Sequence, residues 1–265
     1  MINQCIVSTS LPWLVSGFHK RLGCGYNYHP DNPTYFVGLY SHNDYDRVVS
    51  HRGLAVVVFC GSDAFKLKSR GFYKQFMVIS RKPNVRVVSI SKDIQQVLDD
   101  AGIPNVLYNV CPTQEDRFEV TKPTTNKVYI YYNKAHFDLF DWGLYHSLRE
   151  HYKDEKVVIP DVEKRVFVNP LDMGKVYSEC FVGMKPYLSD GYGNTQVELA
   201  LSGRRCISNG DFVGNLRYGS VDDVIAHIER ELKDVNDVRG RVELRNLALS
   251  ELQLPYGFNE IEFWI

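Results

Sequence analysis

The run of residues 54–60, which reads LAVVVFC, is the feature that most constrains the fold of this chain. It is apolar throughout, whereas a strand with one solvent-facing side alternates apolar and polar residues. Such a run is typical of a strand buried on both faces, as in a parallel sheet that helices cover on both sides. The sequence therefore favours an α/β fold with a parallel sheet.

Strand-like and helix-like segments alternate along the rest of the chain. In the first half, strands are expected at residues 4–7, 35–40, 85–90 and 106–110, and helices at 44–51, 65–76 and 93–100. In the second half, strands are expected at residues 127–132, 156–160, 165–169, 180–184 and from 206, and helices at 139–151, 173–179, from 195, 221–232 and 238–251. Such alternation is typical of parallel α/β sheets.

A polar stretch at residues 114–127, which contains Pro123 and several threonines, is expected to link the two halves. We therefore expect two Rossmann-like domains with mostly parallel sheets that face a cleft. They comprise residues 1–120 and 121–250, with a tail at 251–265 that packs back on the body. Ligands of such sheets usually bind at the carboxyl ends of the strands.

The charge pattern makes a general nucleic-acid binder less favoured. The net charge of the 265 residues is −1, which provides no global basic field. The first 120 residues lean basic, with 13 Lys and Arg against 10 Asp and Glu, and the remainder has 18 against 22. The basic residues that lie close together are Lys66, Lys68, Arg70, Lys74, Arg81, Lys82 and Arg86. They form either a solvated helix face or a local patch for nucleic acid.

Cysteine usage and hydropathy indicate an intracellular setting. The six cysteines are scattered, and none forms a C-x-x-C pair, so reduced core cysteines are expected. The chain shows no long apolar leader and no apolar stretch long enough to cross a bilayer. We therefore expect a cytoplasmic protein without a membrane span.

Residues 183–209, GMKPYLSDGYGNTQVELALSGRRCISN, concentrate chemistry in one short run. Lys185 and Asp190 precede a glycine-rich turn, and Asn194 and Thr195 open a predicted helix that carries Glu198 on its first turn. The first amides of a helix have no helical partner, and the helix dipole is positive there. A polar turn that leads into a helix in this way predicts an anion site.

The same segment resembles a known motif. Asp190-x7-Glu198, followed by LALSG and an apolar strand, resembles the acidic-x7-Glu motif of retaining GT-B nucleotide-sugar glycosyltransferases. The resemblance covers residues 185–207. More weakly, residues 36–40 and 59–63 are similar to the acceptor-side domain of smaller members, and the small size also allows a phage DNA glycosyltransferase.

The resemblance implies a donor site in the second half. Glu198 would accept hydrogen bonds from the ribose hydroxyls, and Lys185 and Lys134 would neutralise the departing diphosphate. The turn at residues 190–194 would contact the sugar, and Thr195 the phosphates. The implied donor-binding residues are Lys134, Lys185, Asp190, Gly191, Gly193, Asn194, Thr195 and Glu198.

The resemblance also implies catalytic and acceptor roles. Asp63, Lys185 and Asp190 are the expected catalytic residues, and Ser10, His19 and Asp63 the expected acceptor-binding residues. The chain has Lys185 where members often have arginine and Asp190 where many have glutamate. The nucleotide-diphosphate sugar, for example a UDP-sugar, is a co-substrate. No cofactor or metal is expected.

Simpler interpretations of these residues stay open. Thr195-x-x-Glu198 also fits a capping box, in which Glu198 only reaches back to its own helix start. Asp63 follows a buried strand and also fits a plain N-cap. Asp44-Tyr45-Asp46 imitates an Asp-x-Asp metal motif, but its position at a helix start indicates helix-end electrostatics. Lys134 also fits an ordinary loop lysine.

The sequence therefore favours a glycosyltransferase that transfers a sugar from a nucleotide-diphosphate donor to a hydroxyl acceptor. The acceptor is a saccharide or glycan, or a hydroxymethylated base in DNA. The motif favours retention of configuration, whereas a base such as Asp63 would permit inversion. The alternative is a non-catalytic module that binds nucleotide sugar or phosphate. A Rossmann oxidoreductase is disfavoured, because no G-x-G-x-x-G follows the first strand of either half.

Overall fold

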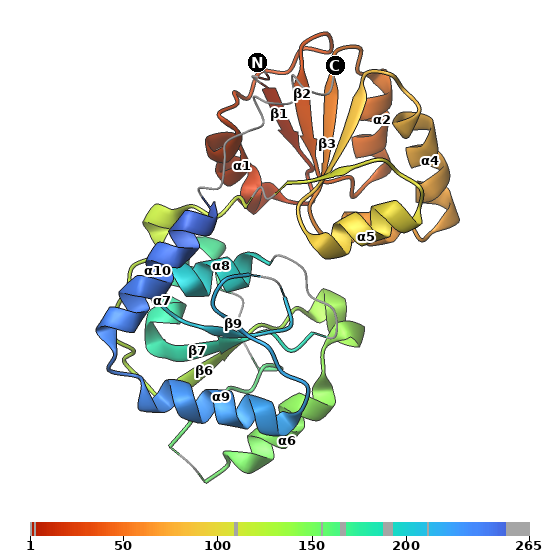
Figure 1. Ribbon diagram of the computed structural model, residues 1–265. Helices are drawn as coiled ribbons and strands as arrows, with labels where there is room; N and C mark the ends of the chain where they lie inside the picture. Colours follow the sequence, from red (N-terminus) through yellow and green to blue (C-terminus); the bar gives the residue numbers. More distant parts are fainter. Residues whose placement is uncertain are drawn as a thin grey trace. The chain divides into compact units, whose positions relative to one another are not determined.

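The computed structural model describes residues 2, 4–108, 111–154, 156–164, 168–187, 193–210 and 212–252. The chain divides into two compact units, and among these residues the first unit ends at Pro112 and the second begins at Thr113. Each unit contains one parallel sheet that helices cover (Figure 1). The expected α/β class with two parallel sheets is therefore confirmed. Residues 113–120, which we expected in the first domain, lie with the second unit.

The sheet of the first unit contains five strands in the described part of the chain, and neighbours in the sequence are neighbours in the sheet. The strands are β1 (Gln4–Val7), β2 (Thr34–Val37), β3 (Ala55–Phe59), β4 (Val85–Ser89) and β5 (Val106–Leu107). The helices are α1 (Val15–Leu22), α2 (His42–Ser50), α3 (Ser62–Lys66), α4 (Arg70–Ser80) and α5 (Lys92–Asp100). Figure 1 shows α1 on one side of β1–β3 and α2 and α4 together on the other.

The central strand β3 lies within the apolar run at residues 54–60, and all five of its residues are buried. Elsewhere in this unit the boundaries differ from expectation. The single helix expected over residues 65–76 is two helices, α3 and α4, separated by a turn. The described part of the last expected strand is only Val106–Leu107.

The start of α2 confirms the helix-end interpretation of the Asp-x-Asp sequence. The Asp44 carboxylate accepts a hydrogen bond from the backbone amide of Ser41, while the Ser41 hydroxyl accepts one from the Asp44 amide. This reciprocal pair is a capping box, which satisfies two amides that the helix leaves without partners. The Asp44 carboxylate therefore serves the helix start.

Several basic side chains of the first unit bind backbone carbonyls. Lys66 donates to the Tyr40 carbonyl at 2.6 Å, and Lys82 donates to the carbonyls of Val49 and His51 at the end of α2. Arg86 donates to the Pro83 carbonyl. A cation at a helix C-terminus is favourable because the dipole is negative there. Part of the expected basic cluster is thus structural.

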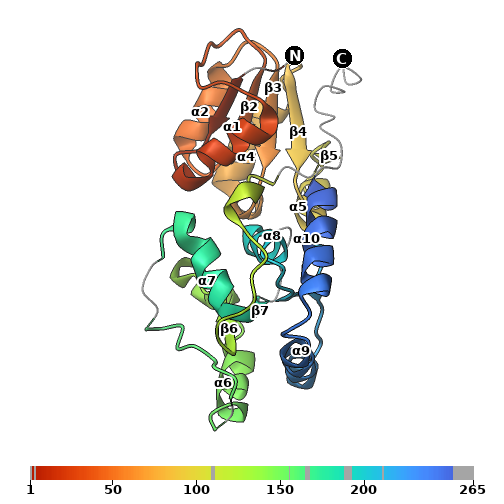
Figure 2. The same cartoon turned by 90° about the vertical axis from the view of Figure 1, so that its left-hand side faces the viewer.

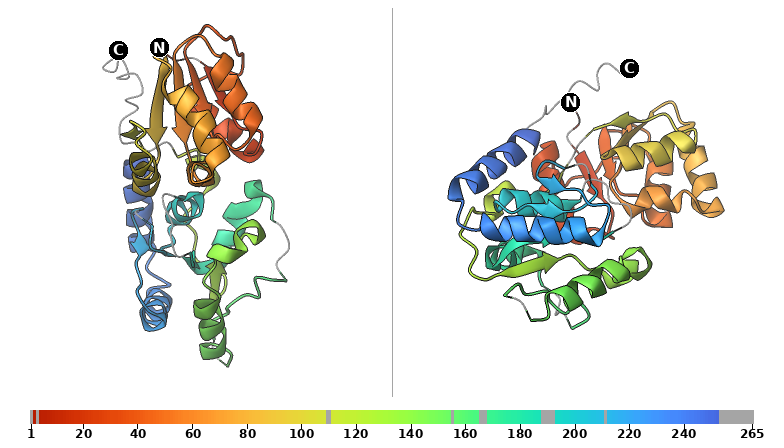
Figure 3. Two further views of the ribbon diagram at one scale, coloured as in Figure 1. Left: turned by 90° about the vertical axis from the view of Figure 1, so that its right-hand side faces the viewer. Right: turned by 60° about the horizontal axis from the view of Figure 1, so that its bottom comes forward.

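The sheet of the second unit contains four parallel strands among the described residues. They are β6 (Lys127–Ile130), β7 (Cys180–Met184), β8 (Cys206–Ile207) and β9 (Asn215–Leu216). The main helices are α6 (Trp142–His151), α7 (Met173–Glu179), α8 (Asn194–Leu201), α9 (Val221–Lys233) and α10 (Val238–Leu252). Figure 1 shows α7, α8 and α10 on one side of this sheet and α6 and α9 on the other. Helix α8 lies beside α10 (Figure 2), and α6 lies beside α9 (Figure 3).

Two expectations for this unit are corrected. The strand expected at residues 156–160 is only an isolated bridge between Val158 and Lys127, and Val158 is about half exposed. Strand β9 has no counterpart in the prediction, because two residues carry no periodic signal. The strand expected at 165–169 falls partly on residues 165–167, which lie outside the described residues.

Helix α8 is fixed closely against the sheet. A Cβ on Gly183 of β7 would lie 2.1 Å from a methyl carbon of Leu199 of α8, so the glycine permits this close approach. At the other end, Arg204 donates to the Ser202 carbonyl, Arg241 to Gly203 and Arg245 to Leu201. These guanidinium groups satisfy carbonyls that the helix end leaves without partners.

The cysteines and the helix lengths bear on the expected cellular setting. All six cysteines are free thiols, and all but the half-buried Cys60 are buried. Among the described residues, no helix combines the length and apolar character that a bilayer crossing requires.

Candidate functional site

The carboxyl edge of the second sheet gathers most of the predicted donor residues. Because β6, β7 and β8 are parallel, the residues that follow them emerge at one edge of the sheet. Lys134 follows β6 and begins a 3-10 helix (Lys134–Leu139), Lys185 follows β7, and Ser208 follows β8. Helix α8 begins at Asn194 near this edge, because its third residue is bonded to Ser208.

Lys185 lies beside two tyrosine rings that contact each other, with their centres 5.6 Å apart. Its Nζ is 5.4 Å from the centre of the Tyr131 ring and 5.9 Å from that of Tyr187. The Tyr187 hydroxyl accepts a hydrogen bond from the Asn133 amide at 3.1 Å, which joins the ends of β6 and β7. Faces of aromatic rings attract a cation, so the two rings orient the ammonium group. By contrast, Lys134 is exposed.

The start of α8 is held by a buried amide side chain. Gln196 donates through Nε2 to the Ser208 hydroxyl at 2.7 Å, and both residues are fully buried. The Gln196 Oε1 atom accepts from the amide of Gly193, the N-cap residue. The positive end of the helix dipole is therefore fixed beside the end of β8, where an anion would be favoured. Thr195 is buried, whereas Gly193 and Asn194 are half-buried.

This geometry corrects the expected capping box. The N-cap residue is Gly193, whose amide donates to Gln196 Oε1, and having no side chain it returns no bond, so Glu198 is the fifth residue of α8 and lies beyond its first turn. A side chain at that position has no reason to return to the helix start, since the box places its acidic or amide residue at the third position. The interpretation of Thr195-x-x-Glu198 as a capping box is therefore wrong.

The carboxylate of Glu198 instead faces α7. The Tyr177 hydroxyl donates to Glu198 Oε2 at 2.7 Å, and Tyr177 is fully buried. Burial raises the pKa of Glu198 to about 7, while the hydrogen bond from Tyr177 and the charge of Arg117 act in the opposite direction. Glu198 thus changes its charge near neutral pH.

Two residues of the predicted donor site cannot be placed. Asp190 and Gly191, together with residues 188, 189 and 192, lie outside the described residues. The catalytic and sugar-binding roles of Asp190 therefore stay predictions.

Asp63 of the first unit is placed where it supports the backbone. It is fully buried at the start of α3, where Oδ1 accepts from the amides of Cys60 and Gly61, and Oδ2 from that of Leu39 at 3.2 Å. Burial raises its pKa to about 6, and these amides oppose the rise. With no exposed surface and both oxygens bonded, Asp63 has a structural role, which argues against the expected catalytic and acceptor-binding roles.

The other expected acceptor residues are Ser10 and His19. Ser10 is exposed, and its amide donates to the Ser8 hydroxyl. His19 is buried in α1, where Nδ1 contacts the Cys24 carbonyl at 3.0 Å and the ring stacks on Tyr26. This packing gives His19 a structural role.

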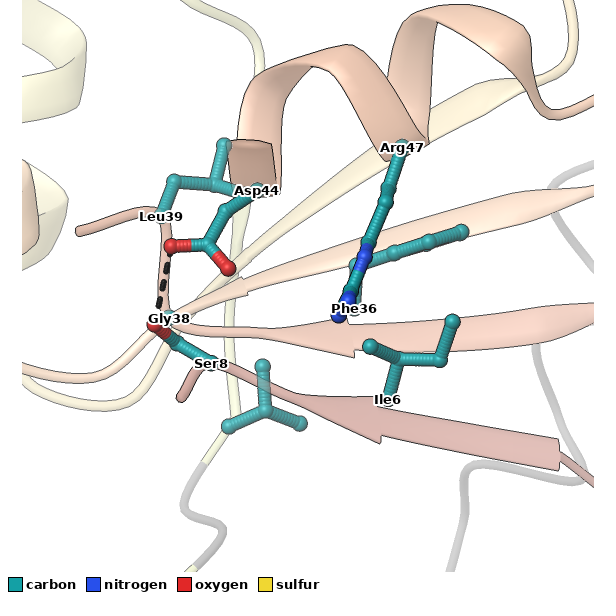
Figure 4. Close-up of a pocket in the computed structure, with 8 residues that line it drawn as sticks. Ile6, Ser8, Phe36, Gly38, Leu39, Asp44 and Arg47 are labelled. Carbon is teal, nitrogen blue, oxygen red and sulfur yellow. Dashed lines mark hydrogen bonds between the residues drawn. The ribbon is translucent and has the colours of Figure 1, made fainter. Parts of the chain in front are cut away.

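A small hollow lies between α2 and the ends of β1 and β2 (Figure 4). Its empty volume is about 170 Å³, with Ile6 and Phe36 on the sheet side and Asp44 and Arg47 on the helix side. The Ser8 hydroxyl donates to Asp44 Oδ2 at 2.8 Å. The hollow is too narrow to admit a water molecule, and Asp44 Oδ2 already accepts from Ser8, Ser41 and the Tyr40 amide, so it is not a ligand site. The sequence prediction did not include Arg47, because nothing in its local pattern distinguishes it from a surface arginine.

Tyr177, Arg117 and Gln196 were also absent from the prediction. The Tyr177–Glu198 pair joins residues 21 positions apart, so only tertiary structure reveals it. In the described part of the chain, no group of three or more His, Cys, Asp or Glu side chains is arranged to hold a metal ion.

Comparison with known proteins gives a likeness of fold. No protein-family model matches the chain, and no curated protein sequence matches it. Among solved structures, the chain is similar to the crystal structure of TarM, a GT-B glycosyltransferase. The TM-score is 0.54 at 15% sequence identity, over 89% of this chain and 55% of that chain.

The chain therefore spans about half the length of the TarM chain that it matches. At this identity the likeness concerns the fold. The five-stranded and four-stranded parallel sheets, each covered by helices, are the common element. The chain accordingly has an α/β fold that resembles the GT-B fold of TarM.

Proposed function

We propose that the protein is a glycosyltransferase that binds a nucleotide-diphosphate sugar at the carboxyl edge of its second sheet and transfers the sugar to a hydroxyl acceptor. The observation that carries the proposal is the arrangement around α8. The helix start and Lys185 lie at the same sheet edge, and Glu198 on that helix is held by Tyr177 and not by its own backbone. The GT-B-like fold supports the proposal.

The residue types fit the chemistry of a departing diphosphate. As the sugar–phosphate bond breaks, negative charge grows on the phosphate oxygens, and the cations Lys185 and Lys134 and the dipole of α8 would stabilise it. The Glu198 carboxylate would accept hydrogen bonds from the two ribose hydroxyls. No metal is required in this scheme, because lysines and helix amides supply the positive charge.

We assign the acceptor to the first unit and favour retention of configuration. Inversion needs a base beside the acceptor hydroxyl, and the burial of Asp63 argues against that candidate. The anomeric configuration of the product, read by NMR, tests this assignment. An inverted product would require a different base.

A saccharide or glycan hydroxyl is the favoured acceptor. Three members of the basic cluster that would have bound DNA, Lys66, Lys82 and Arg86, already donate to carbonyls of their own unit. Phosphate contacts release counterions, so transfer to hydroxymethylated DNA would weaken steeply with added salt. Activity on free saccharides that is insensitive to salt supports the glycan acceptor.

The alternative is a module that binds nucleotide sugar without turnover. It is favoured by one observation: the one front-half residue predicted to be catalytic, Asp63, is bonded to backbone amides. A screen of nucleotide sugars for donor hydrolysis and transfer separates the two functions. Release of nucleoside diphosphate above the rate of the Glu198→Gln variant supports the enzyme. Saturable binding without release supports the module, and no binding contradicts both.

A further inference from the structure

The Tyr177 side chain is the least explained polar group near the candidate site. Its ring is fully buried and packs edge-on against Tyr129, with ring centres 5.0 Å apart, and also contacts Phe118. A phenylalanine would fill this space equally well. The hydroxyl is therefore not needed for packing, and its cost of burial must be met by hydrogen bonds.

The Tyr177 hydroxyl has two hydrogen-bond partners. It donates its proton to Glu198 Oε2 at 2.7 Å, and it shares a hydrogen bond with the Tyr129 side chain of β6. Tyr129 of β6 and Tyr177 of α7 are thus linked, through the Tyr177 hydroxyl, to Glu198 Oε2. This bond to Oε2 restrains the orientation of the Glu198 side chain.

Other charged and titratable groups near Glu198 have their own hydrogen-bond partners. Arg117, in the 3-10 helix Glu115–Arg117, is close enough for its charge to act on Glu198, but its guanidinium donates to the Pro170 carbonyl. From α10, Arg241 and Arg245 bind carbonyls at the far end of α8. The thiols of Cys180 and Cys206, on β7 and β8, donate to carbonyls. Tyr177 is therefore the described hydroxyl that bonds the carboxylate directly.

We propose that Tyr177 is a positioning residue for the nucleotide: its hydroxyl holds Glu198 in one orientation and favours the charged carboxylate, so that donor binding releases a proton when Glu198 is protonated. The inference rests on the proposed function, because it takes the ribose hydroxyls as the partners of the second oxygen. No covalent step is involved; the proton on Glu198 passes to buffer as the hydroxyl donors of the ligand replace it.

The Tyr177→Phe variant tests the inference, because it removes one oxygen and keeps the ring. Affinity for nucleotide sugars, measured by calorimetry at pH 7, is expected to fall about tenfold, the usual effect of losing a hydrogen bond to a charged group. The pH at which binding reaches half of its maximum is expected to move upward, because the lost hydrogen bond no longer lowers the pKa of Glu198. In two buffers of different ionisation enthalpy, wild-type protein near pH 6.5 should show proton release on binding.

Tyr145→Phe is the matched control. Tyr145 is also fully buried in the second unit, and its hydroxyl donates to the Pro160 carbonyl and accepts from the Val162 amide. Its loss should lower stability without moving the pH profile of binding. In a Glu198→Gln background, which has no ionisable group at this position, Tyr177→Phe should not move the pH profile of binding. Equal pH profiles for wild type and Tyr177→Phe would overturn the inference.

A measurement without ligand separates this inference from the proposed function. The Glu198 carboxyl carbon can be titrated by NMR in wild-type protein and in Tyr177→Phe. An upward shift of the midpoint in the variant supports the hydrogen bond as the determinant of ionisation, even if no nucleotide sugar binds. An unchanged midpoint overturns it, whatever the binding experiments show.

Discussion

Asp63 and Glu198 are both carboxylates at the start or in the first turns of a helix that follows a parallel strand, and burial raises the pKa of both. Their partners differ. Asp63 is surrounded by backbone amides of its own turn and of the neighbouring strand end, whereas Glu198 is held by a side chain from another helix. A carboxylate saturated by the backbone stabilises a turn. A carboxylate with one oxygen held by a side chain keeps capacity for a ligand.

The largest effect is expected from Asp63→Asn. Both oxygens of Asp63 accept from amides, so an asparagine must turn its NH₂ group towards one of these donors and leave a buried amide unsatisfied. We expect a loss of about 3 kcal/mol in the free energy of unfolding, measured by urea denaturation. The exposed Asp46→Asn is the control and should stay within about 0.5 kcal/mol of wild type. A stable Asp63→Asn protein that has lost only its activity would reverse our assignment.

Glu198→Gln tests the other side of the comparison. Glutamine keeps an acceptor for the Tyr177 hydroxyl but loses the charge, so we expect nucleotide-sugar affinity at pH 8 to fall by about 2 kcal/mol, with the melting temperature maintained. The control is Glu229→Gln, because Glu229 Oε1 also accepts from a tyrosine, Tyr152, at 3.1 Å. Equal affinities in the two variants would contradict a ligand role for Glu198.

The pH dependence sharpens the comparison further. The pKa of Glu198 is raised from 4.5 to about 7, so the folded state binds its proton more tightly than the unfolded state. Its contribution to stability is therefore present below about pH 4.5 and is lost as the pH rises through 7, by about 3 kcal/mol. Urea midpoints between pH 4.5 and 8 should decline less in Glu198→Gln than in wild type.

Binding should follow the opposite trend over the same range. Ribose hydroxyls donate to the charged carboxylate, so affinity should rise as the pH rises through 7. A nucleotide sugar is the suitable probe, because its phosphates do not titrate near this pH. An affinity that is flat from pH 5.5 to 8 would show that the ionisation of Glu198 is not linked to the ligand.

The smallest effect concerns a pair of lysines, each beside two aromatic rings. Lys66 of the first unit lies near the Tyr40 and Phe72 rings and donates to the Tyr40 carbonyl, whereas Lys185 lies near those of Tyr131 and Tyr187. Lys66→Met should lower stability by about 1 kcal/mol without changing nucleotide affinity. Lys185→Met should lower affinity by about 1 kcal/mol, and less at high salt, because added ions screen the charge. If the two variants changed stability and affinity in the same way, the distinction between a structural Lys66 and a ligand-binding Lys185 would be wrong.

The sequence predicts the parallel sheets well because the strongest strands carry their own signal. Residues 54–60 are apolar throughout, and β3 lies within them with every residue buried. The helix at residue 194 was also expected, since Asn194 and Thr195 follow a glycine-rich turn. Such local signals depend on neighbours in the sequence, and they therefore survive without tertiary information.

The errors occur where a distant contact decides between two local patterns. Gln196 and Glu198 could each reach back to the amide of the residue three positions earlier. The observed helix start is Gly193, whose amide donates to Gln196, and Gln196 is also bonded to Ser208 at the next strand end. The role of Asp63 was open between N-cap and base, and the amide of Leu39, 24 residues away, joins those that surround its carboxylate. Neither contact is visible from spacing alone.

The arginines at the far end of α8 have a consequence for how the second unit responds to its surroundings. Arg204, Arg241 and Arg245 bind neutral carbonyls there, and Arg204 stays charged at neutral pH even though burial lowers its pKa to about 10. The partners of these guanidinium groups are neutral carbonyls, which carry no proton to lose or gain. The axial position of α8 is therefore insulated from the proton exchange at Glu198. Under the proposed function, acidification would change how tightly the unit holds a nucleotide, while α8 stays in place.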